Sequence, residues 1–181
     1  MPSLTDEQLL MLIQNGSSSA FENLSRRYRD KIYSFSYRLL QNEHWAEDVV
    51  QETFLKIFQQ AVNVKQSASF RAWIFAIARN EAFGILRERK LFDELHEESE
   101  ECWGGETPLD RLEEKEEHVL LEKCIQSLKP EYREVILLRE FEQLSYREIM
   151  EITGATESSV KSRLFKVRKA LTKKLTPYYK V

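Results

Sequence analysis

The acidic segment at residues 91–117 limits the fold more than any other stretch, because twelve acidic side chains stand there against two basic ones. Two glycines and a proline lie within it, and this composition favours an extended linker over a packed core. Residues 1–90 carry 12 basic and 10 acidic side chains, and residues 118–181 carry 13 and 8, although the whole chain has a net charge of -3. The sequence therefore predicts two small basic domains joined by a flexible acidic linker, with a helix already beginning near Leu109. Basic ends of this kind are compatible with nucleic-acid binding.

Both flanking parts are expected to be helical, which makes the predicted fold class all-α. Hydrophobic residues make up 42% of the chain, while there are only five glycines and four prolines, a balance typical of a helical protein with a core. Capping boxes are predicted at Thr5 with Gln8 and at Ser19 with Glu22. The helix after the second box carries an apolar stripe at steps of three or four, formed by Phe21, Leu24, Tyr28, Ile32, Phe35 and Leu39.

Membrane, secreted and catalytic classes are not indicated. The sequence has no run of about 18 apolar residues, and its N-terminus lacks the basic and apolar regions of a signal peptide. We therefore expect a cytoplasmic protein without direct membrane insertion. Cys102 and Cys124, with His96 and His118, lack the paired spacing of a zinc site. We recognise no nucleophile and no glycine-rich phosphate loop, and so expect no metal, no cofactor and no enzyme activity.

Residues 46–58, reading AEDVVQETFLKIF, predict a docking helix that ends near Gln60. Val50, Phe54 and Ile57 follow helical spacing and should form its buried stripe. A second flank combines charge with one apolar side chain and suits contact with a partner; it consists of Asp48, Gln51, Glu52 and Leu55. The alternative is an ordinary amphipathic helix whose acidic side is solvated.

A loop and a basic helix are predicted after the docking helix. Residues 61–69 are polar and lack helical periodicity, and Ser69 is expected to cap the next helix. Aromatic side chains interleaved with cations suit single-stranded DNA, because bases stack on rings while cations hold the phosphates. The alternative for Phe70 and Trp73 is that both rings belong to the core. The candidate single-strand contacts are Val62, Asn63, Lys65, Ser69, Phe70, Arg71, Trp73, Arg79 and Asn80.

The most specific local pattern predicts a helix-turn-helix in the last third of the chain. Ser145 and Glu148 should form a capping box, Gly154 should end that helix, and Thr156 should cap the next one. Residues 156–174 carry seven cations and one acid, so the second helix is expected to lie on DNA. A helical hairpin that binds no DNA is the alternative. The candidate duplex contacts are Ser158, Ser159, Lys161, Ser162, Arg163, Phe165, Lys166 and Arg168, with Arg163 and Arg168 assigned to phosphates.

Two parts of the chain resemble bacterial RNA polymerase sigma factors, in particular the short two-domain extracytoplasmic-function (ECF) group. Residues 21–89, including FENLSRRYRDKIYSFSYRLL, AEDVVQETFLKIF and FRAWIFAIARNEAFGILR, resemble sigma region 2. The stretch LSYREIMEITGATESSVKSRLFKVRKAL resembles sigma region 4. The order, the spacing and the total length agree with this group as well.

The resemblance implies a promoter-specificity subunit of RNA polymerase. Region 2 would bind the paired clamp helices of the β′ subunit through the acidic flank of the docking helix. It would also open the minus-10 promoter element, and its loop at residues 62–69 would receive a flipped base. Region 4 would read the minus-35 element and rest on the β flap, and an anti-sigma factor would control the protein. The alternatives are a helix-turn-helix regulator that acts alone and an interaction protein whose basic helices bind an acidic partner.

The acidic linker has three possible roles. It can follow a positively charged channel of the polymerase towards the RNA exit, as the resemblance implies. It can fold back on residues 156–174 and screen them from DNA through weak, salt-sensitive pairs. The third role is that of a solvated spacer, which is what most charge runs are.

Overall fold

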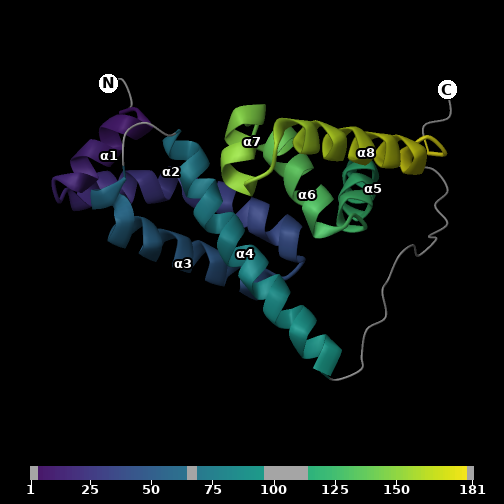
Figure 1. The fold of residues 1–181 in the computed structure, drawn as a ribbon, viewed down its shortest axis with the longest axis horizontal. Coiled ribbons are helices and arrows are strands. Elements are labelled where there is room, and N and C mark those ends of the chain that lie inside the picture. The colour runs from purple at the N-terminus through teal and green to yellow at the C-terminus, as the bar shows by residue number, and fades with distance from the viewer. Residues whose placement is uncertain (1–3, 65–68, 96–113, 179–181) are drawn as a thin grey trace.

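The computed structural model describes residues 4–64, 69–95 and 114–178, and every regular element in these ranges is helical (Figure 1). This confirms the all-α fold class for the described part of the chain. In chain order the elements are α1 Asp6–Gln14, α2 Ser18–Leu40, α3 Glu43–Gln60, the 3-10 turn η1 Ala61–Asn63, α4 Phe70–Leu95, α5 Glu114–Gln126, α6 Pro130–Ile136, the π-helical turn η2 Leu137–Phe141, α7 Tyr146–Thr153 and α8 Glu157–Leu175.

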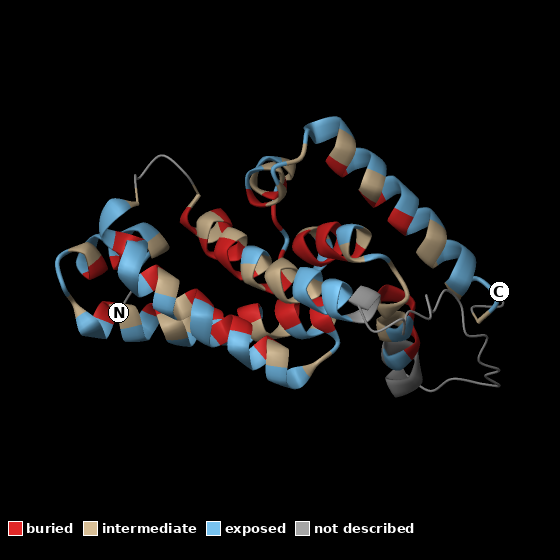
Figure 2. Ribbon diagram, turned by 60° about the horizontal axis from the view of Figure 1, so that its bottom comes forward, coloured by how far each residue is buried: buried red, intermediate tan, exposed pale blue. Residues whose placement is uncertain are grey.

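Helices α1 to α4 form a first unit around the apolar stripe of α2. Helix α2 packs against α1, α3 and α4, and the ring of Phe35 meets the edge of Phe75 on α4 at 5.7 Å between centroids. Figure 2 shows buried residues along the inner sides of these helices. The predicted stripe is confirmed, since all its members are buried except Phe21, which is partly buried.

The start of α2 differs from the prediction. The expected capping box of Ser19 with Glu22 does not form, because the N-cap is Ser17, whose hydroxyl accepts a hydrogen bond from the Ala20 amide at 3.3 Å. Gly16 has φ 83° and ends the preceding turn directly before Ser17. The first of three consecutive serines is therefore the cap, and the helix begins at Ser18, earlier than the Ser-x-x-Glu pattern indicates.

The predicted caps at Thr5 and Ser69 are confirmed in the first unit. Thr5 and Gln8 form the capping box of α1. Gln41 adopts the left-handed conformation after α2, and the side chain of Asn42 accepts a hydrogen bond from the first turn of α3. The Ser69 hydroxyl accepts a hydrogen bond from the first turn of α4 at 3.3 Å, as a cap does.

Helices α5 to α8 form a second unit, in which α7 and α8 make the predicted helix-turn-helix. Ser145 and Glu148 form the capping box of α7, and Gly154 ends this helix with φ 67°. The Thr156 hydroxyl then accepts a hydrogen bond from the Ser159 amide and starts α8. The inward positions of α8 are buried, namely Val160, Leu164 and Val167.

The two units pack against each other, which the sequence did not predict. Helix α4 packs along α7, while α2 contacts α5, α6 and η2 (Figure 1). Buried residues of both units belong to one continuous hydrophobic cluster. Helical structure extends into both ends of the expected linker, because α4 continues to Leu95 and α5 begins at Glu114. Residues 96–113, which include Cys102, lie outside the described residues.

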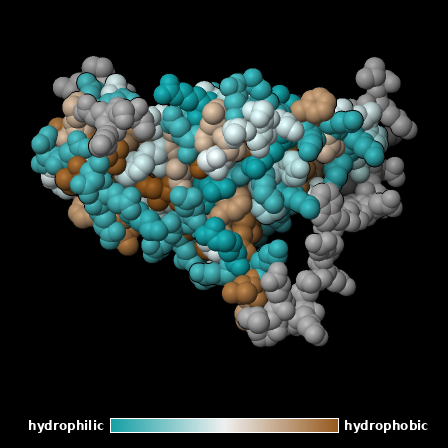
Figure 3. All heavy atoms as spheres, in the orientation of Figure 1, coloured by the Kyte–Doolittle hydropathy of each residue, from teal (hydrophilic) through white to brown (hydrophobic). Residues whose placement is uncertain are grey.

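The described surface is mainly polar. Figure 3 shows a largely hydrophilic face, with hydrophobic atoms beside the grey segment that follows α4, in agreement with the exposure of Leu91 and Phe92. No helix in the described ranges is long and apolar enough to cross a membrane. Within the same ranges, no group of three or more His, Cys, Asp or Glu side chains is placed to hold a metal ion. Cys124 is buried, and burial raises the pKa of its thiol.

Candidate polymerase and promoter interface

The predicted docking flank of α3 is exposed along its whole length. The opposite stripe holds the helix to the core, since Val50 and Ile57 are buried and the Phe54 ring meets the edge of Phe21 at 6.3 Å between centroids. The structure thus presents the four predicted residues together on one accessible surface, consisting of Asp48, Gln51, Glu52 and Leu55.

Phe58 adjoins the docking flank, and the sequence reasoning missed it. Its side chain is 64% exposed, and its ring meets the edge of Phe21 at 5.5 Å between centroids. Phe58 follows Leu55 by three positions, so both lie on one side of the helix. This spacing was the available signal, and Phe58 enlarges the apolar part of the surface.

The first candidate single-strand contacts lie on η1. Val62 and Asn63 are exposed there, Val62 to 66%. Gln14 of α1 anchors the turn, because its side-chain amide donates hydrogen bonds to two backbone carbonyl oxygens at 2.9 and 3.2 Å. Lys65 lies outside the described residues. The turn is therefore held in place while Val62 and Asn63 face solvent.

Phe70 is a core residue in this conformation. Its side chain is 3% exposed, and its ring stacks on Trp73 with 5.5 Å between centroids and 24° between planes. Trp73 is half-buried against the hydrophobic cluster. The prediction that Phe70 supports an opened DNA strand conflicts with this burial, because a base can stack only on an accessible ring. Phe70 therefore belongs to the core, which was the alternative interpretation of this ring.

Most predicted contacts of α8 lie on its exposed side. Lys161 is 2.7 Å from the Glu157 carboxylate and Arg168 is 2.6 Å from that of Glu140, and hydrogen bonds to these carboxylates raise the pKa of both cations. Exposed pairs of this kind add little to stability because water screens them, so a phosphate can replace the carboxylate. The exposed set is Ser158, Lys161, Ser162, Phe165, Lys166 and Arg168, while Ser159 and Arg163 are half-buried.

Comparison with known families matches two parts of the chain, one on each side of the acidic linker. A model of sigma-70 region 2 matches residues 24–91, and a model of sigma-70 region 4 matches residues 118–171. The chain is 32% identical to the RNA polymerase sigma-H factor of Pseudomonas aeruginosa over 95% of its own length and 94% of the relative's. It is 31% identical to the ECF RNA polymerase sigma factor SigW of Bacillus subtilis over 90% and 92%. The chain is an ECF sigma factor of the sigma-70 family.

A sigma factor directs transcription initiation by binding core RNA polymerase and promoter DNA. Two solved structures share the fold. CnrH in complex with the cytosolic domain of CnrY gives a TM-score of 0.68 at 21% identity, covering 93% of this chain and 96% of that one. RpoE in complex with the anti-sigma factor NepR from Bartonella quintana gives 0.65 at 23% identity, covering 94% and 96%. The first unit is region 2 of this sigma factor and the second is region 4.

Region 4 contacts two of the predicted minus-10 residues at the start of α4. The Ser69 hydroxyl donates a hydrogen bond to the Glu148 carboxylate at 2.8 Å. The Arg71 guanidinium donates to the backbone oxygen of Glu142, and it lies 3.8 Å from the Glu142 carboxylate. Burial raises the pKa of Glu142, and the charge of Arg71 opposes this rise. Both region 2 side chains therefore point at region 4.

Glu134 of α6 holds one arginine from each predicted DNA-binding helix. Its carboxylate lies 2.8 Å from Nε of Arg79 on α4 and 3.3 Å from Nη1 of Arg163 on α8, and its side chain is only 1% exposed. Burial raises the Glu134 pKa, while the two arginines lower it. The Arg79 guanidinium also lies 4.2 Å from the centroid of the Phe83 ring, and Asn80 beside it is exposed. Arg79, a predicted DNA contact, is thus already paired with Glu134 in this conformation.

Arg133, the neighbour of Glu134, joins the ends of two helices. It is 7% exposed, and its guanidinium donates to the carbonyl oxygen of Leu39 at 2.6 Å and to those of Gln126 and Leu128 at 2.5 and 2.8 Å. These carbonyls lie at the C-terminal ends of α2 and α5, where backbone acceptors lack intrahelical partners and the helix dipole favours a cation. Burial lowers the Arg133 pKa to about 10. Sequence reasoning did not identify this contact between the regions.

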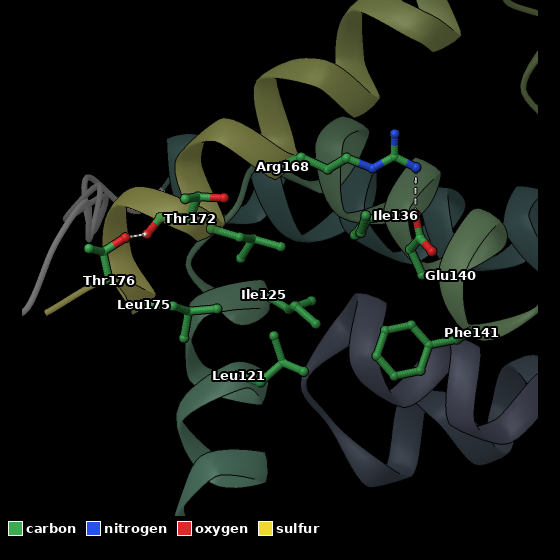
Figure 4. Close-up of a pocket in the computed structure, with 10 residues that line it drawn as sticks. Leu121, Ile125, Ile136, Glu140, Phe141, Arg168, Thr172, Leu175 and Thr176 are labelled. Carbon is green, nitrogen blue, oxygen red and sulfur yellow. Dashed lines mark hydrogen bonds and ion pairs between the residues drawn. The ribbon is translucent and has the colours of Figure 1, made fainter. Parts of the chain in front are cut away.

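A groove of about 650 Å³ lies on region 4 between α5, the end of α6, η2 and α8 (Figure 4). The close-up shows aliphatic side chains from α5 and α8 and the Phe141 ring turned towards it. The ion pair of Arg168 with Glu140 lies at its edge. An apolar groove with a charged rim suits a partner surface whose central side chains are apolar. The apolar lining consists of Leu121, Ile125, Ile136, Phe141, Leu171 and Leu175.

Proposed function

We propose that this sigma factor binds the β′ clamp helices of core RNA polymerase through the docking flank of α3. The observation that carries the proposal is the exposure of all four residues of this flank on a helix whose opposite stripe is buried. Two carboxylates beside an accessible leucine give a surface that combines polar and apolar contacts, as partner interfaces do. The exposed Phe58 ring extends the apolar part.

We further propose that residues 1–90 read and open the minus-10 element, and that residues 118–181 read the minus-35 element. The acidic linker would join these two domains, and the protein would act in the cytoplasm. The exposed side chains of Val62, Asn63 and Asn80 support contact with a separated strand. The exposed side of α8 supports contact with a major groove, because its buried side packs the helix against the rest of region 4. Arg71, Arg79 and Ser69 reach DNA only after they leave their region 4 partners.

The apolar groove of region 4 is the proposed binding site for the β flap. Its walls come from α5, α6, η2 and α8. None of its lining residues is assigned to DNA bases, and Arg168, which is assigned to a phosphate, lies at its edge. An anti-sigma factor is the proposed regulator, as the family resemblance implies. It would act by covering the docking flank or this groove, because each is accessible in the free protein.

Charge reversal on the docking flank tests the proposed function. Replacing both Asp48 and Glu52 by Lys should weaken binding to core polymerase by at least about tenfold and abolish run-off transcription from a cognate promoter. Stability should change by less than about 0.5 kcal/mol per site, since both positions are exposed. Asp30→Lys, an exposed reversal on α2, is the matched control for each of the two single reversals. Unchanged core affinity in the double variant would refute the assignment of this flank.

A second measurement separates a sigma factor from a regulator that acts alone. The pure protein should retard promoter DNA strongly only when core polymerase is added. Equally strong retardation without polymerase would favour the stand-alone regulator, and no retardation under either condition would favour an interaction protein.

A further inference from the structure

The 3-10 turn η1 presents two of the predicted minus-10 contacts on a short, closed piece of backbone. Val62 and Asn63 are exposed there, whereas Ala61 before them is buried. The amide of Val64 donates a hydrogen bond to the carbonyl oxygen of Ala61 at 3.3 Å and closes the turn. The two exposed side chains therefore start from a backbone whose ends are joined.

Gln14, the last residue of α1, binds both ends of this turn. Its side-chain nitrogen donates hydrogen bonds to the carbonyl oxygen of Ala61 at 2.9 Å and to that of Val64 at 3.2 Å. Ala61 precedes Val62 and Val64 follows Asn63, so the two acceptors enclose the exposed pair. A primary amide carries two N–H groups, and this geometry gives each of them an acceptor. One side chain thus fixes the turn from outside its own segment.

Helix α1 gives Gln14 a defined position relative to η1. Leu9 and Ile13 are buried on its inner side. In its first turn, the Asp6 carboxylate accepts a hydrogen bond from the Tyr28 hydroxyl of α2. Gln14 is itself half-buried, so water competes less for its amide than it would at an exposed site. The donor that holds η1 is therefore carried by a helix that is packed in place.

The position of a turn matters when its side chains read DNA bases. Hydrogen bonds weaken steeply once their distance or angle departs from the preferred range, and a site whose supporting groups are loose loses precision. Selectivity is a difference between the affinities for two sequences. A turn that can shift to suit either base keeps much of its affinity while it loses this difference.

We propose that Gln14 is a positioning residue for minus-10 recognition, which holds η1 so that Val62 and Asn63 distinguish one promoter sequence from another. It acts through the backbone of η1 and not by contact with DNA, although 47 positions separate it from Ala61 in the chain. The proposal rests on the proposed function for the identity of the DNA element. By this route the N-terminal helix α1 contributes to promoter selectivity.

Selection by reconstituted holoenzyme from a promoter library with a randomised minus-10 element tests this role. The double variant of Val62→Ala with Asn63→Ala first identifies the positions that η1 reads, as those whose base preference it loses. Gln14→Met keeps the length of the side chain and removes both N–H donors. At the same positions its base preference should fall about fivefold, which is the usual effect of losing a neutral hydrogen bond. Its affinity for core polymerase should stay within about twofold of the parent, since the docking flank is a separate site.

Gln8→Met on the same helix is the matched control. It makes the same chemical change but takes a hydrogen bond from the capping box of α1 and not from η1. It should lower the stability of α1 and keep the base preference of the parent. Gln14→Lys should keep most of the preference as well, because an ammonium group supplies N–H donors at a similar reach and suits the C-terminal end of a helix.

Three results would overturn the proposal: an unchanged preference in Gln14→Met, an equal loss in Gln8→Met, or a loss in Gln14→Lys as large as that in Gln14→Met. A fourth comes from adding Gln14→Met to the double variant. This addition should leave the base preference as it is, because no reading side chain then remains on η1, and a further loss would mean that Gln14 acts elsewhere.

Failure of the proposed function has a different signature. If the parent holoenzyme selected no minus-10 sequence, or if the double variant kept every preference of the parent, η1 would not read the promoter, and the role of Gln14 would fall with that function. A selected sequence that depends on Val62 and Asn63 but survives in Gln14→Met would overturn the role of Gln14 alone.

Discussion

Two cations on α8 are expected to contact different parts of the DNA, Arg168 a phosphate and Lys161 a base edge. Arg168 pairs with Glu140 and Lys161 with Glu157 in the free protein, and both pairs are exposed. Arg168→Ala should lower affinity for every sequence and reduce the slope of log affinity against log salt by about 1, because a phosphate contact releases a counterion. Lys161→Ala should instead change the preferred bases.

Selection from a randomised minus-35 library, with titrations at several salt concentrations, measures both effects. Lys173→Ala on the last turn of α8 is a control for the loss of one charge, and it should leave the base preference unchanged. If Lys161→Ala returned the consensus of the parent, Lys161 would not be a base-reading residue.

The turn between α7 and α8 depends on a left-handed residue. Gly154 has φ 67°, and a Cβ placed there would meet nothing within 4 Å, so the penalty for Ala is the backbone conformation alone, about 1–2 kcal/mol. Gly84 lies inside α4 with ordinary helical φ, and a Cβ there would meet only Arg87 at 4.0 Å. Gly154→Ala should therefore destabilise the protein, and Gly84→Ala should stabilise it by about 1 kcal/mol. Chemical denaturation measures both, and two changes of the same sign would contradict this reading.

The cap of α7 should make stability depend on pH. Burial of Glu148 opposes its ionisation, but hydrogen bonds from Ser145 and Ser69 outweigh burial and hold its pKa below the ordinary value of 4.5. A carboxyl whose folded pKa is depressed contributes stability above its unfolded pKa, and this contribution is lost as the pH falls through the folded pKa. Glu148→Gln should thus cost about 1 kcal/mol at pH 7 and progressively less below pH 4.5.

Urea unfolding between neutral and acidic pH measures this cost. The exposed variant Glu151→Gln should cost less than about 0.5 kcal/mol at every pH. A cost of Glu148→Gln that did not shrink on acidification would mean that its carboxylate charge does not stabilise the cap.

At the scale of the whole molecule, the contact between regions should couple their unfolding. Arg133 joins the ends of α2 and α5, and one hydrophobic cluster spans both regions. The parent should therefore unfold in one calorimetric transition. Arg133→Met should give two transitions, because it leaves the carbonyl groups of α2 and α5 without the cation that bridges them. Arg147→Met, at a side chain 86% exposed, should keep the single transition, and a single shifted transition in Arg133→Met would argue against the coupling.

The sequence by itself determined most helices and the helix-turn-helix of this sigma factor. Thr5 with Gln8, Ser145 with Glu148, and Gly154 act on backbone groups a few positions away, so their effect can be read without the fold. Helical spacing likewise placed the docking flank on one side of α3. The same local logic chose the wrong cap for α2, because three consecutive serines offer the same chemistry and only the turn at Gly16 decides between them.

The tertiary structure alone decided which polar residues meet across the two regions. Arg79 and Glu134 are 55 positions apart, and Arg133 and Leu39 are 94 apart. In the sequence Arg79 and Glu134 are simply charges on amphipathic helices, each as compatible with solvent as with a partner. Phe70 was open to two interpretations for the same reason, and the packing of α4 determined its burial. Pairings of this kind depend on how helices dock, and docking depends on the summed fit of many side chains that no local pattern records.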